Sequence, residues 1–448
     1  MKRLMQHQEE AKLFLEFNPS LAIYAEMGLG KTAIVLSYVA DHMRTGEIKD
    51  VLVVCPASLV PNWEQAIEEM ADFEGITEDD LNNLRKITIR SYQKMYSSSK
   101  VDVPHRDGRV TKKRSLSLRE DVDRKWDLFV VDESHSIGTH NSIQTKSAIS
   151  LSKLSDRIIL LSGTPFHGPG GRPAYAKMYG QFQVLSKGKL WRSWTQFCEE
   201  YVTSYDLWHN PRSFNEEKCR AVIKDHSITY RLADCVDMPE RVEQTIPCPL
   251  AETKMYEDIK KGDVSKYGID IESGGGFYLK MLQICSGSMK RPTDTMMLRT
   301  SKDDVLADIL NGTDDKVVVF CNYRASVDRC AQICRKAGRK TITYDGRSAS
   351  DAWKQFTEGD CTAIVCQYQS GGVGLNLQCS HTMVLFEPCL SALLLEQAKG
   401  RIYRKGQANR CVYYYLTTPK SIESRVADSV RKGVDVSNEM LERFALEV

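Results

Sequence analysis

The chain has no long hydrophobic run, no closely paired cysteine motif and no excess of charge of either sign. No stretch approaches the roughly 20 apolar residues that a membrane-spanning helix needs, and the N-terminus lacks the apolar run of a signal peptide. The 61 Lys and Arg residues against 59 Asp and Glu leave a net charge of +2. That balance neither supports nor excludes nucleic acid as a partner, because local patches set such binding. We expect a protein that works dissolved inside a cell.

The 14 cysteines are scattered, and no C-x-x-C pair occurs. The closest spacings are Cys330/Cys334 and Cys361/Cys366, and others, such as Cys55, lie within apolar runs. Isolated thiols of this kind are typical of reduced intracellular proteins. They favour neither a disulfide framework nor a structural zinc site.

Short apolar, β-branched runs alternate with helical spacing in both halves of the chain. In the first half we expect strands at Leu21–Ala25, Val51–Cys55, Ile87–Arg90, Leu128–Val131 and Ile158–Ser162. In the second half we expect them at Val242–Pro247, Val317–Cys321, Lys340–Tyr344, Ala363–Cys366, Thr382–Phe386 and Val412–Thr417. Alternating strands and helices predict an α/β fold whose parallel sheets are covered by helices on both faces.

A chain of 448 residues is too long for one compact core, so two domains are expected. We place the first at residues 1–245, with a helical insertion at about 168–235, where the alternation breaks. The second covers residues 246–448, with a helical segment at about 250–300.

The segment Lys100–Arg114 carries six basic residues against two acidic ones, between two predicted strands. Two interpretations remain open. One is a solvated loop, and the other is a loop that contacts the phosphates of a nucleic acid.

An apolar strand, a glycine turn and a helix carry the sequence AEMGLGKT at Ala25–Thr32. In this context backbone N–H groups point at a phosphate chain. Lys31 is expected to reach the terminal phosphates of ATP, and the Thr32 hydroxyl to bind Mg²⁺. Ala25 stands where such a loop usually begins with glycine, and an ordinary glycine turn is the alternative. The predicted nucleotide-binding residues of this loop are Gly28, Leu29, Gly30, Lys31 and Thr32.

A second half of such a site is expected at the end of another apolar strand, and DESH at Asp132–His135 supplies it. Asp132 is expected to hold Mg²⁺, and Glu133 to position and deprotonate the attacking water. Adjacent Asp and Glu residues are also common on surfaces. The position after a hydrophobic strand, downstream of the glycine loop, favours the catalytic interpretation.

An ordered series of motifs resembles superfamily 2 helicases, and within them the Swi/Snf-type DNA translocases. The resemblance covers nearly the whole chain. Its motifs are Gln8, AEMGLGKT, CPASLVPNW (Cys55–Trp63), DESH, LSGTP (Leu161–Pro165), VVVFCNYR (Val317–Arg324), GGVGLNL (Gly371–Leu377) and QAKGRIYRKGQ (Gln397–Gln407). The resemblance implies two tandem RecA-like domains.

The resemblance also implies roles for single residues. Gln8 is expected to recognise adenine, and Gln397 to face the nucleotide cleft. Arg401 and Arg404 are expected to reach the γ-phosphate from the second lobe and to stabilise transition-state charge. Their spacing of three predicts one shared face of a helix, and an ordinary basic helix surface is the alternative.

Positions that match the nucleic-acid contacts of the family are Ser58, Ser91, Thr164, Asn322, Arg324 and Gly372. In the second lobe the sequence differs from the family pattern at two places. Gln367 and Tyr368 stand where the family commonly has Ser or Thr, and Glu387–Cys389 stands where it has Trp-Asn-Pro.

The resemblance implies an ATP- and Mg²⁺-dependent motor that moves along double-stranded DNA, with plain, forked and branched forms left open. It implies a monomer without appended histone-reading domains, of the kind expected in bacterial or phage-infected cells, or in a nucleus if the source is eukaryotic. Three alternatives remain: a strand-separating or annealing helicase in replication, recombination or repair, a motor that uses RNA as its track, and a nucleic-acid-binding scaffold without catalysis.

Overall fold

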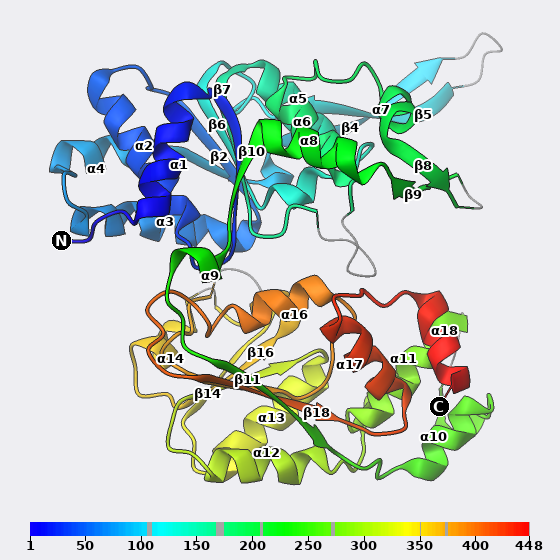
Figure 1. Cartoon of the computed structure of the whole chain (residues 1–448). Helices are drawn as coiled ribbons and strands as arrows, with labels where there is room; N and C mark the ends of the chain where they lie inside the picture. Colours follow the sequence, from blue (N-terminus) through cyan, green and yellow to red (C-terminus); the bar gives the residue numbers. More distant parts are fainter. Residues whose placement is uncertain are drawn as a thin grey trace. The chain divides into compact units, whose positions relative to one another are not determined.

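The computed structural model describes residues 1–104, 110–166, 174–206, 209–269, 274–349, 351–371 and 375–447. They fold as two compact units, which divide between Val236 and Asp237. This division falls slightly before the boundary expected at residues 245 and 246, because the strand Arg241–Pro247 pairs with a strand of the second unit. Figure 1 shows each unit as a sheet with helices packed on its faces.

The first unit is built on a six-stranded parallel sheet in the order β10-β1-β7-β6-β2-β3. Its elements are α1 (Gln6–Phe17), β1 (Ser20–Ala25), α2 (Lys31–Thr45), β2 (Val51–Cys55), α3 (Val60–Glu69), α4 (Glu78–Leu84), β3 (Thr88–Ser91), β4 (Tyr96–Pro104), β5 (Val110–Leu118), β6 (Trp126–Asp132), α5 (Ile143–Lys153), β7 (Ser155–Ser162), α6 (Lys177–Leu185), α7 (Trp194–Tyr201), β8 (Val202–Tyr205), β9 (Pro211–Phe214), α8 (Glu216–His226), β10 (Ser227–Tyr230) and α9 (Leu232–Cys235). Strand β2 is buried along its whole length, as expected for a parallel strand covered on both faces.

The second unit repeats this architecture with the order β11-β18-β17-β14-β16-β15, again all parallel. Its elements are β11 (Arg241–Pro247), α10 (Thr253–Lys260), α11 (Gly274–Cys285), β12 (Ser288–Lys290), β13 (Thr295–Met297), α12 (Lys302–Asn311), β14 (Val317–Cys321), α13 (Arg324–Lys336), β15 (Thr341–Tyr344), α14 (Lys354–Thr357), β16 (Ala363–Gln367), α15 (Tyr368–Gly371), β17 (Thr382–Leu385), α16 (Ala392–Lys399), β18 (Cys411–Thr417), α17 (Ile422–Arg431) and α18 (Asn438–Glu447). The predicted α/β class with two parallel sheets is confirmed.

Two segments of the first unit differ from expectation. The stretch Lys100–Arg114 was expected as a loop, but its described residues, 100–104 and 110–114, lie in the antiparallel strands β4 and β5, which extend away from the main sheet in Figure 1. The alternation in SSSKVDV and SLSL is a strand signal with a period of two. The region expected to be helical at 168–235 contains α6 to α9, but also β10, which joins the main sheet beside β1.

Within the described ranges no helix has the length and apolar character to cross a bilayer. All 14 cysteines are free thiols, and most are buried.

Candidate functional site

The glycine loop connects β1 to α2 at the carboxyl edge of the first sheet, which is where open parallel sheets bind ligands. Gly28 has φ of 88° and Gly30 has φ of 70°, a left-handed conformation that glycine adopts without strain. Lys31 opens α2, and its Nζ donates to the carbonyl of Ala25 at 2.7 Å. The loop therefore aims its lysine at the end of β1.

Gln8 packs directly against this loop. Its side chain is almost fully buried, and its Nε2 donates to the carbonyl of Leu29 at 3.1 Å. A Cβ at Gly30 would lie 2.2 Å from the same nitrogen, so a side chain there would displace Gln8 and would also be strained at this positive φ. The ring of His7 contacts the Leu29 carbonyl at 3.0 Å as well. The structure thus brings Gln8 to the loop, and its contact with adenine stays a prediction.

The carboxylate pair ends β6, two strands away from β1 in the sheet. Trp63 donates its indole N–H to Asp132 Oδ2 at 2.9 Å, and the main-chain N–H of Glu133 donates to Oδ1 at 2.9 Å. Burial raises the pKa of Asp132 to about 6, the neighbouring charge of Glu133 adds to this, and the Trp63 bond and Lys31 oppose it. Two carboxylates at this buried edge leave negative charge that a divalent cation would stabilise.

Glu133 is held in an unusual backbone conformation. Its φ is 51°, which costs about 1–3 kcal/mol for a residue other than glycine and is typical of functional sites. The hydroxyl of Tyr92 donates to the carbonyls of Asp132 at 2.7 Å and of Glu133 at 3.3 Å, which supports the turn. The ring of His135 lies 3.2 Å from the Glu133 carboxylate.

Strand β7 lies between β1 and β6, and it leads into the sequence SGTP. An added Cβ at Gly163 would lie 3.6 Å from Lys31 Nζ and 3.5 Å from the Ala25 carbonyl. The Ser162 hydroxyl accepts from the main-chain N–H of Thr164 at 3.1 Å and lies 3.3 Å from His135 Nδ1. The glycine loop, the carboxylate pair and the SGTP segment therefore meet at one edge of the sheet.

The sequence motifs do not include Gln181, which links the end of β1, the DESH motif and the SGTP segment. This buried residue of α6 accepts from the hydroxyls of Ser134 at 2.8 Å and Tyr24 at 3.2 Å, and donates to the carbonyl of Pro165 at 3.0 Å. Its only sequence signal is a polar residue in the apolar run of a helix.

The closing motif of the second unit differs from expectation in its local structure. Helix α16 ends at Lys399, so Arg401 and Arg404 lie in the turns that follow and not on a helix face. Gly400, a poor helix residue, is the C-cap. Arg401 is buried and donates to the carbonyls of Gln397 at 2.9 Å and Leu375 at 3.1 Å.

Arg404 is half-buried, and its Nε donates to the carbonyl of Gly400 at 2.9 Å. Gln407 is buried, and its amide nitrogen lies within 3.1 Å of the carbonyls of Gln378, Ser380 and Ile402. The last residue of the motif thus fixes the turn that carries the arginines. The roles assigned to Arg401, Arg404 and Gln397 stay predictions.

The candidate nucleic-acid contacts lie in turns and at the ends of strands and helices of both units. Ser58 is exposed in the turn before α3, Ser91 is buried at the end of β3, and Thr164 is half-buried. Arg324 is exposed at the start of α13. Gly372 lies outside the described residues.

Comparison with known families bears on this arrangement. Residues 15–326 match the SNF2-related domain, and residues 301–406 match the helicase conserved C-terminal domain. The chain belongs to the SNF2-related family. It is therefore an ATP-dependent helicase-type ATPase, and the Swi/Snf resemblance of its motifs is confirmed.

Several SNF2-type relatives are similar over most of this chain. The uncharacterized ATP-dependent helicase YqhH of Bacillus subtilis is 22% identical, over 94% of this chain and 76% of its own length. The DNA repair and recombination protein RAD54-like of Drosophila willistoni is 22% identical, over 90% of this chain and 57% of its own length. The chain thus spans about half to three quarters of such relatives. The Sulfolobus solfataricus SWI2/SNF2 ATPase core, solved in complex with dsDNA, has a TM-score of 0.43 and 19% identity, covering 98% of this chain and 96% of that one.

Proposed function

We propose that this SNF2-family ATPase is a motor that translocates on double-stranded DNA and thereby moves or remodels DNA or DNA–protein complexes. The observation that carries the proposal is the proximity of the SGTP segment to Lys31. Thr164, a candidate track contact, follows directly on Gly163, and a Cβ added at Gly163 would lie 3.6 Å from Lys31 Nζ. Loss of the terminal phosphate of ATP would therefore shift Lys31 and, with it, the SGTP segment that carries the proposed DNA contact Thr164.

ATP and Mg²⁺ are the cofactors that fit this edge. Within the described residues no group of three or more His, Cys, Asp or Glu side chains could hold a metal alone. Asp132 and Thr32 would instead share Mg²⁺ with the phosphates of ATP, and the ion would neutralise charge that develops on them. Lys31 would bind the terminal phosphates, and Glu133 would orient the attacking water and accept its proton.

Arg404 and Arg401 would complete the site from the second unit when the units close over ATP. Hydrolysis would then release them. If each unit holds the phosphate backbone in turn, each cycle moves the protein along the duplex. We propose that a monomer is sufficient for this cycle, and that the DNA is a plain, forked or branched duplex.

Duplex DNA is expected to stimulate the ATPase more than single-stranded DNA of the same length, because both units would follow the phosphate backbone of a duplex. Steady-state ATPase titrations with the two DNAs at one salt concentration measure this. Equal stimulation, or none, would count against duplex DNA as the track.

Replacing Lys31 by Ala is expected to abolish measurable hydrolysis, since the variant loses the cation that binds the terminal phosphates. DNA affinity should survive, because the glycine loop is not a proposed track contact. ATPase assays and DNA titrations on the same preparation measure both quantities. Arg44→Ala on the same helix, whose side chain pairs with Asp80, is the control. Retained turnover in Lys31→Ala would refute the assigned site.

A strand-separating or annealing helicase is the second candidate. The observation that favours it is the β4–β5 hairpin, a protruding element of the first unit in which Lys100 lies opposite Arg114. A hairpin is the kind of element that can divide two strands.

A further inference from the structure

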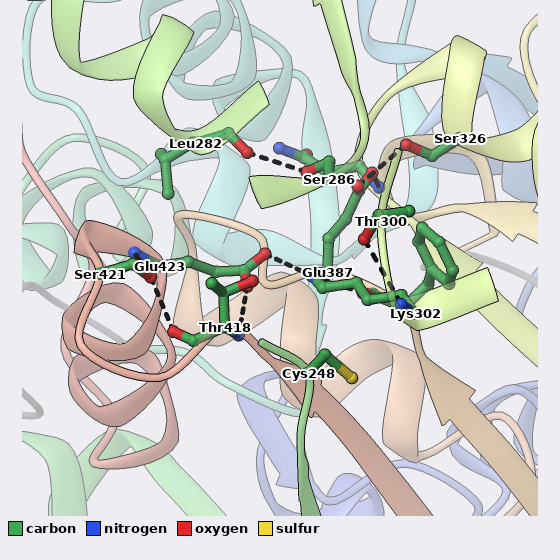
Figure 2. Close-up of polar contacts among 12 residues, drawn as sticks. Cys248, Leu282, Ser286, Thr300, Lys302, Ser326, Glu387, Thr418, Ser421 and Glu423 are labelled. Atoms are coloured by element: carbon green, nitrogen blue, oxygen red, sulfur yellow. Dashed lines mark hydrogen bonds and ion pairs between the residues drawn. The ribbon is translucent and has the colours of Figure 1, made fainter. Parts of the chain in front are cut away.

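Three neighbouring strands of the second sheet, β14, β17 and β18, end at a buried cluster of charged residues, and Figure 2 shows polar contacts in this cluster. Lys302, Glu387 and Glu423 have relative exposures of 0%, 1% and 0%. Charges so deeply buried are rare unless each one is paired and hydrogen-bonded. The contacts of each member therefore indicate what the cluster holds in place.

Lys302 and Glu423 form an ion pair, with Nζ and Oε1 separated by 2.5 Å. Lys302 also donates to the carbonyl of Phe386 at 3.0 Å, and Glu423 Oε2 accepts from the main-chain N–H of Thr418 at 2.7 Å. This pair ties the first residue of α12 to the first turn of α17. The other partners of the pair are main-chain groups of residues that follow β17 and β18.

Glu387 has a different set of partners. Its Oε1 accepts from the main-chain N–H groups of Asn322 at 2.8 Å and Tyr323 at 2.9 Å. Its Oε2 accepts from the hydroxyl of Ser326 at 2.9 Å. These three donors belong to the turn that follows β14 and to the first turn of α13, and a further donor, Ser286, follows α11.

Glu387 thus binds the segment that leads into α13 from inside the protein. The N-cap residue Tyr323 makes no side-chain cap, and its main-chain N–H is held by the carboxylate. Burial raises the pKa of Glu387, and Lys302 together with the donors from Ser286, Tyr323 and Ser326 opposes this rise. The nearby ammonium and these donors limit the rise without cancelling it.

The segment that Glu387 holds includes two candidate track contacts, Asn322 and Arg324. The main-chain N–H of Asn322 is taken by the carboxylate, whereas Arg324, at the start of α13, is exposed. Resting on the function proposed above, we propose that Glu387 is a positioning residue for DNA. It fixes the turn before α13, and so holds the guanidinium of Arg324 where it can bind a phosphate of the track.

The test compares Glu387→Ala, which removes the carboxylate, with Glu387→Gln. The glutamine oxygen can still accept from both main-chain N–H groups, and its amide can donate to Ser326. We expect Glu387→Ala to raise the half-saturating duplex concentration in ATPase titrations about tenfold, the scale of one charge-assisted contact. The rate at saturating DNA should stay within about twofold, and Glu387→Gln should restore most of the affinity.

The salt dependence of DNA binding separates positioning from a general loss of stability. Arg324→Ala should reduce the slope of log affinity against log salt by about 1, the value for one phosphate contact. Glu387→Ala should reduce it equally, and the double variant Glu387→Ala/Arg324→Ala should be no worse than Arg324→Ala alone. The control is Glu423→Gln, which weakens the ion pair but keeps Glu387 and the Lys302 ammonium beside it. It should lower the unfolding temperature and leave the half-saturating DNA concentration within about twofold.

Additive effects in the double variant, or an unchanged half-saturating concentration in Glu387→Ala, would overturn the role of Glu387. If Glu387→Ala does not fold, Ser326→Ala replaces it, and a two- to threefold weaker response to DNA is expected, on the scale of one ordinary hydrogen bond. An unchanged response there would overturn the role equally. A wild-type chain that neither binds duplex DNA nor responds to it would instead overturn the proposed function, and the role of Glu387 in DNA binding with it.

Discussion

Glu133→Gln is expected to lower kcat for ATP hydrolysis by about 10²–10⁴-fold, the range for loss of a general base. The glutamine keeps the size of the side chain but cannot accept the proton of the attacking water. Asp132, which ends β6 just before it, keeps its bonds to Trp63 and to the main-chain N–H of residue 133. ATP and Mg²⁺ should therefore still bind with nearly unchanged affinity.

Single-turnover hydrolysis and nucleotide titration measure the two quantities separately. Glu64→Gln makes the same chemical change at an exposed carboxylate beside Trp63, and its turnover should equal that of the wild type. If Glu133→Gln hydrolyses ATP at the wild-type rate, the general base must be another residue.

Arg404→Ala is expected to reduce the DNA-stimulated kcat by about 10³-fold, the scale of an arginine that stabilises phosphoryl transfer. Arg401 is buried and engaged with two main-chain carbonyls, whereas Arg404 is half-buried in the turn that Gln407 supports. Of the two arginines, Arg404 therefore has the greater freedom to reach a phosphate on another unit.

ATP affinity in Arg404→Ala should change little, because the first unit supplies the glycine loop. Lys405→Ala removes the adjacent, exposed positive charge and is the matched control, with an expected rate within twofold of the wild type. A full rate in Arg404→Ala would reassign the residue to the structure of the turn.

Much of the framework of both sheets follows from the sequence because parallel strands are buried on both faces. Val51–Cys55 and Val317–Cys321 consist only of apolar residues, and their observed strands have the predicted bounds. The meeting of Lys31 with Asp132 and Gly163 also follows, since the carboxyl ends of parallel strands share one edge. Sequence motifs that follow parallel strands therefore predict which residues of the candidate site lie close together.

Features that depend on tertiary contacts were not predictable in this way. Strand β10 has only four residues, SITY, and becomes a strand because β1 offers it an edge. The end of α16 before Arg401 depends on local turns, which periodicity does not show. Gln181 and Glu387 act on segments far away in the sequence, so their roles become visible only when the partners are in place.

Triplex displacement beside strand displacement, on matched DNA substrates, tests the central claim most directly, because the first reports movement and the second reports unwinding. The account predicts ATP-dependent removal of the third strand from a duplex, without separation of the duplex itself, and loss of this activity in Glu133→Gln. Separation of the duplex strands would support the helicase alternative. A third strand that stays in place while ATP is hydrolysed would contradict translocation on duplex DNA.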